Sequence, residues 1–180
     1  LAAELALQRA MRELEAEVAS SLAAQGYALV LDGPLQASLP RAVGYVKTQQ
    51  RSLLAPDQNA ALGGLRAGQR SSLFAWGSKH GCYIRLGRNA GHQHPYHGLV
   101  RLEAMGEAEA CRGWLHEVAG WLPAFAGVAH LDPRAPQNLQ PIAGLEKELR
   151  RRCGYPGLAL RAVRQAVAQI HKEERWSESA

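Results

Sequence analysis

An aspartate stands at the end of an apolar stretch, ALVLDGPL, in which Asp32 follows residues suited to a buried strand. A partly buried carboxylate costs free energy unless a partner compensates for its lost hydration. Asp-Gly-Pro favours turns, so Asp32 is explained either as a turn residue or as a metal ligand. The second explanation has support from position, because ligands in open α/β sheets bind at the carboxyl ends of the strands.

A second carboxylate lies on the helix predicted before this strand. The helix is predicted over residues 1–25, where apolar positions recur every three or four residues: Leu7, Met11, Leu14, Val18 and Leu22. Glu15 falls about 40° from Met11, at the edge of this stripe, where it either extends to solvent or needs a partner. The link to the strand is short, so Glu15 and Asp32 can share one rim. Paired carboxylates suit Mg²⁺ or Mn²⁺, which prefer oxygen ligands and stabilise the charge of phosphoryl transfer.

Two other groups carry possible chemistry. His92, His94 and His97 have a spacing that can bind zinc, but no fourth ligand is evident, so a solvated loop is favoured. Glu103 follows Arg101 by two residues on a predicted strand, which is typical of a surface ion pair.

Basic residues follow the second predicted strand. Lys47 and Arg51, together with Arg41 and Arg70, could form a patch that binds phosphates. The arginine run 150–152 ends a predicted helix, where positive charge suits the helix dipole, and we interpret it as structural.

The elements that must position these residues run in the order helix, strands, helices. Strands are predicted at residues 27–31, 42–48, 72–76, 82–86 and 99–104, and further helices at 57–62, 107–121, 141–153 and 158–175. The continuous apolar run at 27–31 indicates a central strand that is covered on both faces. This order predicts an α/β or α+β class with one mixed sheet.

Composition limits the class of protein. The chain has 180 residues, 47% hydrophobic and 21% charged, which predicts a single packed domain over residues 1–180. The net charge of +5 permits nucleic-acid binding without establishing it. Three widely separated cysteines indicate a reducing compartment, and the sequence has no long apolar run, so we expect a cytoplasmic protein with no membrane partner. Because the sequence opens with Leu1 inside a helical pattern, we expect it to be part of a longer protein.

Four stretches together resemble the NurA family of DNA-repair nucleases: the helix MRELEAEVA, the strand and turn VLDGPL, the following GYVKT, and the later VRLEA. The resemblance covers roughly residues 11–167, and its strongest part is the helix glutamate followed by a strand-end aspartate. It implies an RNase H-like core in which Glu15 and Asp32 bind a divalent metal, commonly Mn²⁺, with an aspartate from an earlier strand. We expect this third carboxylate to lie upstream of this chain.

We therefore predict an α/β domain with an RNase H-like mixed sheet flanked by helices, which cleaves DNA phosphodiesters with Mn²⁺ or Mg²⁺. Glu15 and Asp32 are the predicted catalytic and metal-binding residues. The predicted partners are DNA, a HerA-type hexameric ATPase in double-strand break end resection, and a second copy of the chain. The predicted DNA contacts are Lys47, Arg51, Arg134, Gln137 and Asn138.

Two alternatives remain open. The late motif of the family has a Tyr-Pro and then an Ala-His, whereas the matching positions here are Ala135 and the pair Ala143-Gly144. This departure favours a non-catalytic adaptor of the same fold, which binds DNA for a ring ATPase without cutting it. The other alternative is an unrelated small-molecule enzyme that uses the histidine loop.

Overall fold

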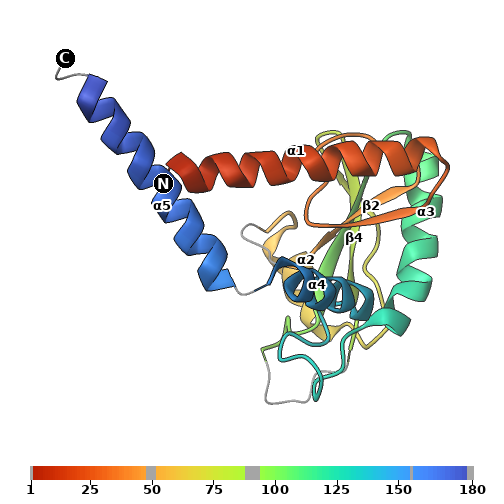
Figure 1. Cartoon of the computed structure of the whole chain (residues 1–180). Helices are drawn as coiled ribbons and strands as arrows, with labels where there is room; N and C mark the ends of the chain where they lie inside the picture. Colours follow the sequence, from red (N-terminus) through yellow and green to blue (C-terminus); the bar gives the residue numbers. More distant parts are fainter. Residues whose placement is uncertain (1, 48–51, 88–93, 155, 178–180) are drawn as a thin grey trace. The chain divides into compact units, whose positions relative to one another are not determined.

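A computed structural model describes residues 2–47, 52–87, 94–154 and 156–177 (Figure 1). The chain divides into two compact units, Leu1–Leu139 and Gln140–Ala180, each described by itself below. The first unit contains α1 (Ala2–Ala24), β1 (Leu29–Asp32), β2 (Ala42–Val46), α2 (Pro56–Ala61), η1 (Leu62–Gly64), β3 (Phe74–Trp76), β4 (Lys79–Arg85), β5 (Leu99–Met105), α3 (Ala108–Trp121) and η2 (Leu122–Phe125). The second contains α4 (Gln140–Cys153) and α5 (Pro156–Ser177).

The first unit is built on a five-stranded sheet with the strand order β1-β2-β5-β4-β3. β1 and β2 are parallel, whereas β2 with β5, β5 with β4, and β4 with β3 are antiparallel. The predicted α/β class with a mixed sheet flanked by helices is therefore confirmed. The predicted turn before β4 is tighter than expected, because Gly77 has a φ of +56° and the reversal needs only two residues.

The prediction that residues 27–31 form a central strand is wrong. β1 is an edge strand, and β2 is its only strand neighbour in the described sheet. Leu29 is buried, but Val30 and Leu31 are only half-buried and Asp32 is exposed. The fully buried strand is β2, which lies between β1 and β5. A continuous apolar run indicates only that the strand has hydrophobic neighbours. An edge strand that packs against a helix, as β1 packs against α1, also has such neighbours.

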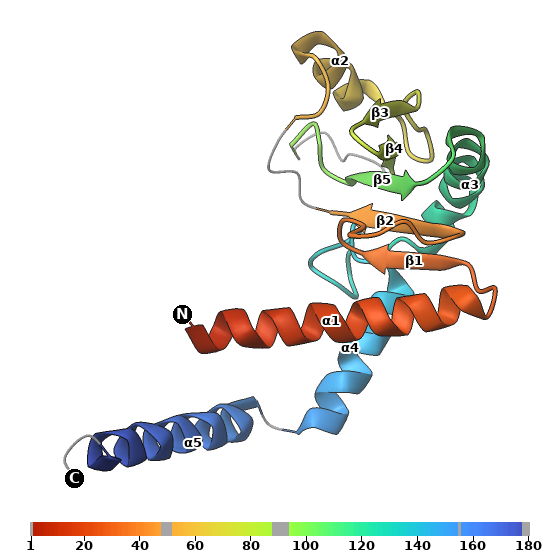
Figure 2. The same cartoon turned by 90° about the horizontal axis from the view of Figure 1, so that it is seen from above.

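Helix α1 packs against the sheet only near its C-terminus. Ala19 and Ala23 are buried with Leu29 and Ala42, and Leu22 packs against this cluster. The rest of the predicted apolar stripe is uncovered, since Leu7, Met11, Leu14 and Val18 are 49–63% exposed. β1 runs back alongside α1, toward the N-terminus of the helix (Figure 2). The N-terminal half of α1 extends past the end of β1, so its apolar side chains are not buried against the sheet (Figure 2).

Alternate residues of β5 face two different layers. Leu99 packs with η1 and Met105 with the α1 cluster, so these odd-numbered positions face α1 and η1. The even-numbered positions face the opposite way, where α3 packs on β2, β4 and β5. The sheet thus separates an α1 face from an α3 face.

Arg85, at the end of β4, ties two surrounding segments to the sheet. Its side chain donates to the carbonyls of Leu62, Gly63, Pro95 and His97, and the residue is only 1% exposed. Burial lowers the pKa of this guanidinium. The carbonyls replace the hydration that the charge has lost, so η1 and the turn before β5 are held together at this end of the sheet.

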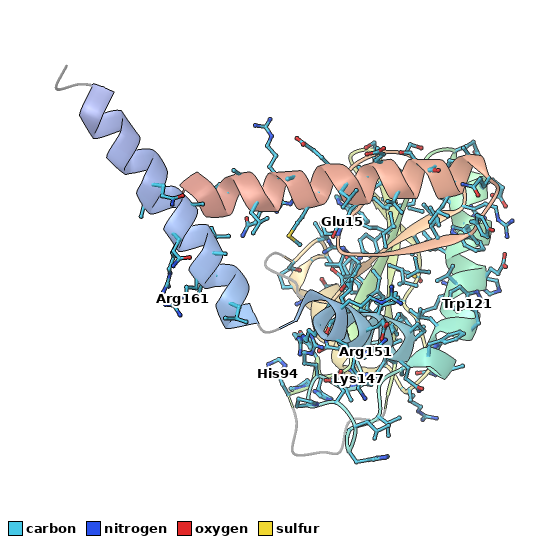
Figure 3. All side chains as sticks on the ribbon, in the orientation of Figure 1. Glu15, His94, Trp121, Lys147, Arg151 and Arg161 are labelled. Carbon is cyan, nitrogen blue, oxygen red and sulfur yellow. The ribbon has the colours of Figure 1, made fainter. Side chains whose placement is uncertain are left out.

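The second unit consists of two amphipathic helices. Their large apolar side chains are exposed: Leu145, Leu149, Leu158, Leu160, Val163 and Val167. The last turn of α4 carries the predicted arginine run, of which Arg151 and Arg152 bond to Glu148 (Figure 3). None of the helices in the described part of the chain combines the length and apolar character that crossing a bilayer requires.

Substitution of Gly44 tests the packing of β2. A Cβ at this position would lie 2.9 Å from both Glu103 Cγ and the Gly33 carbonyl oxygen, and 3.0 Å from the Leu35 amide nitrogen. Two of these neighbours are backbone atoms, so Gly44→Ala should lower the free energy of unfolding by about 1–3 kcal/mol, the usual cost of overpacking. Urea denaturation measures this loss.

Gly64→Ala is the matched control, because a Cβ there would meet nothing within 4 Å. It should change the free energy of unfolding by less than about 0.5 kcal/mol. Equal effects of the two substitutions would show that β2 is not packed as described.

Candidate functional site

Asp32 ends the edge strand β1, and the chain turns away directly after it. It is paired in register with Tyr45 of β2, and its side chain is 44% exposed. The Gly33 amide donates to the Tyr45 carbonyl at 2.9 Å, and Gly33 has a φ of +114°, which glycine adopts without strain. Asp32 is therefore an accessible carboxylate on a backbone that is held on both sides.

Lys47 lies beside Asp32 because β1 and β2 are parallel, so that both chains leave the sheet at the same edge. The Lys47 ammonium donates to Asp32 Oδ2 at 2.7 Å and to Asn138 Oδ1 at 3.3 Å. The Lys47 side chain is 23% exposed, so most of it is covered beside these two partners. The predicted acidic residue and the predicted phosphate-binding lysine are brought together.

Asn138 fixes the position of Lys47 from the other side. It is 1% exposed, and its amide group donates to Asp132 Oδ2 while its carbonyl oxygen accepts from Lys47. The buried side chain is thus occupied within the protein. Asp32, Lys47, Asn138 and Asp132 form one hydrogen-bonded series, which we call the Asp32 site.

Asp132 was not predicted from the sequence. The bond from Asn138 lowers the pKa of its carboxyl group, and the backbone amide and charge of Arg134 lower it further. The signal that could have identified it is its place in the proline-containing loop that supplies the predicted DNA contacts. Arg134 itself lies in this loop with its side chain 54% exposed, 3.5 Å from Asp132.

Tyr45 and Gln137 attach this loop to the sheet. The Tyr45 hydroxyl donates to the Gln137 carbonyl at 2.5 Å, and the Gln137 side-chain amide donates to the Leu99 carbonyl at 3.1 Å. Burial raises the pKa of Tyr45, and the negative charge of Asp32 raises it further. Gln137, a predicted DNA contact, therefore bonds to the protein through both its backbone and its side chain.

Glu15 lies on α1, one turn before the buried Ala19 and on the same side of the helix (Figure 3). Its side chain is exposed. α1 covers the face of the sheet that carries Leu29, whereas Asp32 is an odd number of residues further along β1 and faces the opposite way. In the described residues, no hydrogen bond or ion pair links Glu15 to the Asp32 site. The shared rim of Glu15 and Asp32 stays a prediction.

Two other predicted residues, Arg51 and His92, lie outside the described residues. His94 Nδ1 accepts from the Tyr96 amide. Within the described ranges, no three His, Cys, Asp or Glu side chains gather closely enough to hold a metal ion.

The prediction of a surface ion pair between Arg101 and Glu103 is wrong about its location. Glu103 is fully buried, and the Arg101 side chain is 13% exposed. Glu103 also bonds to Lys79, which sequence reasoning did not identify because Lys79 is 24 residues away. An ion pair between strand neighbours could be anticipated, but its burial depends on what covers the sheet.

The comparisons with known proteins add no family assignment. No model of a protein family matches this sequence, and a search of curated proteins found no match. The resemblance to the NurA family therefore rests on the quoted residues alone and stays a prediction.

The pH dependence of stability tests the environment of Tyr45. Its pKa is raised in the folded protein, so its contribution to stability is complete below about pH 10, the pKa of an unfolded tyrosine, and is lost as the pH rises further. Tyr45→Phe should cost about 1 kcal/mol at neutral pH, because the bond to Gln137 is lost. It should also flatten the decline of stability above about pH 10.

Urea unfolding from neutral pH to about pH 11 measures both effects. Tyr27→Phe is the control, because Tyr27 is 57% exposed, and it should change neither value. The assignment fails if the variant at position 45 loses stability as steeply as the parent protein.

Proposed function

We propose that this chain is a NurA-like, RNase H-like domain that cleaves DNA phosphodiesters with a divalent metal ion at Asp32. The observation that carries this proposal is the pairing of Asp32 with Lys47, an exposed carboxylate and an ammonium 2.7 Å apart at one edge of the sheet. Phosphodiester hydrolysis needs both kinds of group, because the metal requires an anionic ligand and the phosphate requires a cation.

The donor set fits Mn²⁺ or Mg²⁺ better than a softer metal. Such ions take oxygen ligands, keep several waters, and are bound by one or two carboxylates together with substrate phosphates. Asp32, which is exposed, is the residue that would hold the ion. Glu15 is included only because the resemblance implies it, since α1 covers the face of the sheet opposite to Asp32. A bound ion of this kind polarises the phosphate and lowers the pKa of the attacking water.

The remaining residues of the site bind the phosphate or hold the side chain that binds it. Lys47 supplies a positive charge for a phosphate oxygen, and Asn138 holds Lys47 from inside the protein. Asp132 in turn accepts from Asn138, so the amide keeps the orientation that presents its oxygen to Lys47. Arg134, exposed on the same loop, adds a second cation for the DNA backbone. Such contacts predict binding that depends on salt and little on sequence.

The proposed cellular setting is DNA end resection. The partners that belong to this proposal are DNA, a HerA-type hexameric ATPase and a second copy of the chain. Their support is the resemblance of the quoted motifs to the NurA family.

Substitution of Asp32 tests cleavage directly. Asp32→Asn keeps the shape of the side chain but removes its charge, so Mn²⁺-dependent cleavage of single- and double-stranded DNA should fall by roughly 100-fold or more. Glu15→Gln should reduce cleavage as well if Glu15 shares the ion. The matched control is Asp57→Asn, an exposed aspartate in the first turn of α2, which should cleave like the parent.

An Asp32→Asn variant that cuts at the parent rate would rule out Asp32 as a metal ligand. Normal cleavage by Glu15→Gln would remove Glu15 from the site while leaving Asp32 in it.

A non-catalytic adaptor that binds DNA is the second candidate. The observation that favours it is the departure from the late motif of the family, at Ala135 and at the pair Ala143-Gly144. An adaptor of this kind would bind DNA equally well with aspartate or asparagine at position 32 and would cut with neither.

Both candidates require Lys47 to contact a phosphate. Lys47→Gln should weaken DNA binding and reduce the slope of log affinity against log salt concentration by roughly 1. Fluorescence anisotropy at several salt concentrations measures this slope. Arg66→Gln, a change at an exposed arginine far along the chain from the Asp32 site, is the charge-matched control. Equal slopes for the parent and the Lys47 variant would exclude a phosphate contact.

A further inference from the structure

The backbone of Leu35 is held on both of its polar groups by two charged side chains. The Leu35 amide donates to Glu103 Oε1 at 2.7 Å, and its carbonyl accepts from the Lys79 ammonium at 2.7 Å. Lys79 also donates to the same Glu103 oxygen at 2.6 Å. We call Glu103 and Lys79 the Leu35 clamp.

A glycine on the neighbouring strand β2 gives the Glu103 side chain the room to reach Leu35. Glu103 is paired in register with Gly44 of β2 and with Gly81 of β4. A Cβ on Gly44 would lie 2.9 Å from Glu103 Cγ and 3.0 Å from the Leu35 amide nitrogen. The side chain therefore crosses β2 over a position where any other residue would block it.

The Leu35 clamp holds the chain three residues after Asp32, and the backbone between Asp32 and Leu35 has little conformational freedom. The Gly33 amide is bonded to Tyr45 of β2, and Pro34 has a fixed φ. The Leu35 side chain is 3% exposed and packs with Ala19 and Ala23 of α1. The position of Leu35 thus constrains the turn that carries Asp32.

Stability alone is a weak explanation for this cluster. Glu103 is fully buried, and its two cationic partners, Lys79 and Arg101, have side chains that are 21% and 13% exposed. Buried ion pairs are often replaceable by apolar residues without loss of stability, because desolvation offsets the attraction between the charges. What apolar residues could not supply is the pair of directed bonds to Leu35.

We propose that Glu103 and Lys79 are positioning residues for Asp32, which hold the turn after β1 where Asp32 meets its ligand. The predicted effect on Mn²⁺ binding rests on the proposed function. The prediction that Glu103 and Lys79 hold the turn does not depend on that function. Arg101 is not part of the clamp, because it donates to the other oxygen of Glu103 and contacts the Trp76 ring, not Leu35.

The comparison of Lys79→Met with Arg101→Met tests the clamp. Each change removes one positive partner of Glu103, but only Lys79 also bonds to Leu35. Lys79→Met should speed hydrogen exchange of the Gly33 and Leu35 amides by roughly tenfold or more, whereas Arg101→Met should leave it near the parent value. Two-dimensional NMR measures exchange at both amides, and urea denaturation gives the global stability of each variant.

Mn²⁺ affinity, measured by calorimetry on the full chain, provides the functional readout. Lys79→Met should weaken it by about 10–100-fold, the usual effect of removing a group that orients a metal ligand. Lys79→Arg can still donate to both Leu35 and Glu103 and should restore most of the affinity. Arg101→Met should bind Mn²⁺ like the parent.

Equal acceleration of exchange in the Lys79→Met and Arg101→Met variants, in proportion to lost stability, would overturn the clamp whatever the Mn²⁺ result. If exchange separates the two variants but the parent binds no Mn²⁺, the clamp stands and the proposed metal-dependent function fails. If Asp32→Asn abolishes Mn²⁺ binding while Lys79→Met leaves it unchanged, the function stands and the positioning role is overturned.

Discussion

The hydrogen bonds and ion pairs of the buried Glu103 carboxylate are the interactions on which the position of the turn after β1 depends. Glu103 lies on β5, the middle strand of the sheet, and receives Lys79 from β4, Arg101 from its own strand and the amide of Leu35. A buried charge that loses a partner costs several kcal/mol. Lys79 and the Leu35 amide share one oxygen of this carboxylate, so the loop after β1 cannot move independently of β4 and β5.

β2 carries the contacts that hold the Asp32 turn on both faces of the sheet. Its residues alternate between the faces, so Gly44 lies under Glu103 on the α1 face while Tyr45 points to the α3 face. Tyr45 holds the loop of Gln137 through its hydroxyl, and Lys47, just beyond the strand, bonds to Asp32. Because β2 is buried along its whole length, both sets of contacts share one rigid support.

Arg85 and Glu103, the two buried charges among the described residues of the first unit, have different surroundings. Arg85 is surrounded by backbone carbonyls, which bind η1 and the turn before β5 to one end of the sheet. Glu103 is surrounded by charged side chains as well as a backbone amide. A backbone carbonyl stays in place when a side chain is substituted, whereas side-chain partners can be replaced one at a time. The environment of Asp32 is thus open to tuning by single substitutions in a way that the Arg85 end is not.

The sequence by itself determined the class of the fold and the approximate place of every strand, because hydrophobic periodicity and turn residues are local signals. It also placed Asp32 and Lys47 at the ends of consecutive strands and noted Asn138 in a polar loop. It could not identify Asp132 as part of the site, because the loop of Asp132 reaches the site through the bond between Asn138 and Lys47, which are 91 positions apart. It also could not show the burial of Glu103, whose bond to Leu35 joins residues 68 positions apart. Nor could it show that β1 is an edge strand, or that most of the α1 stripe is exposed. An apolar pattern records which residues prefer burial, but only the tertiary structure decides which neighbours exist to bury them.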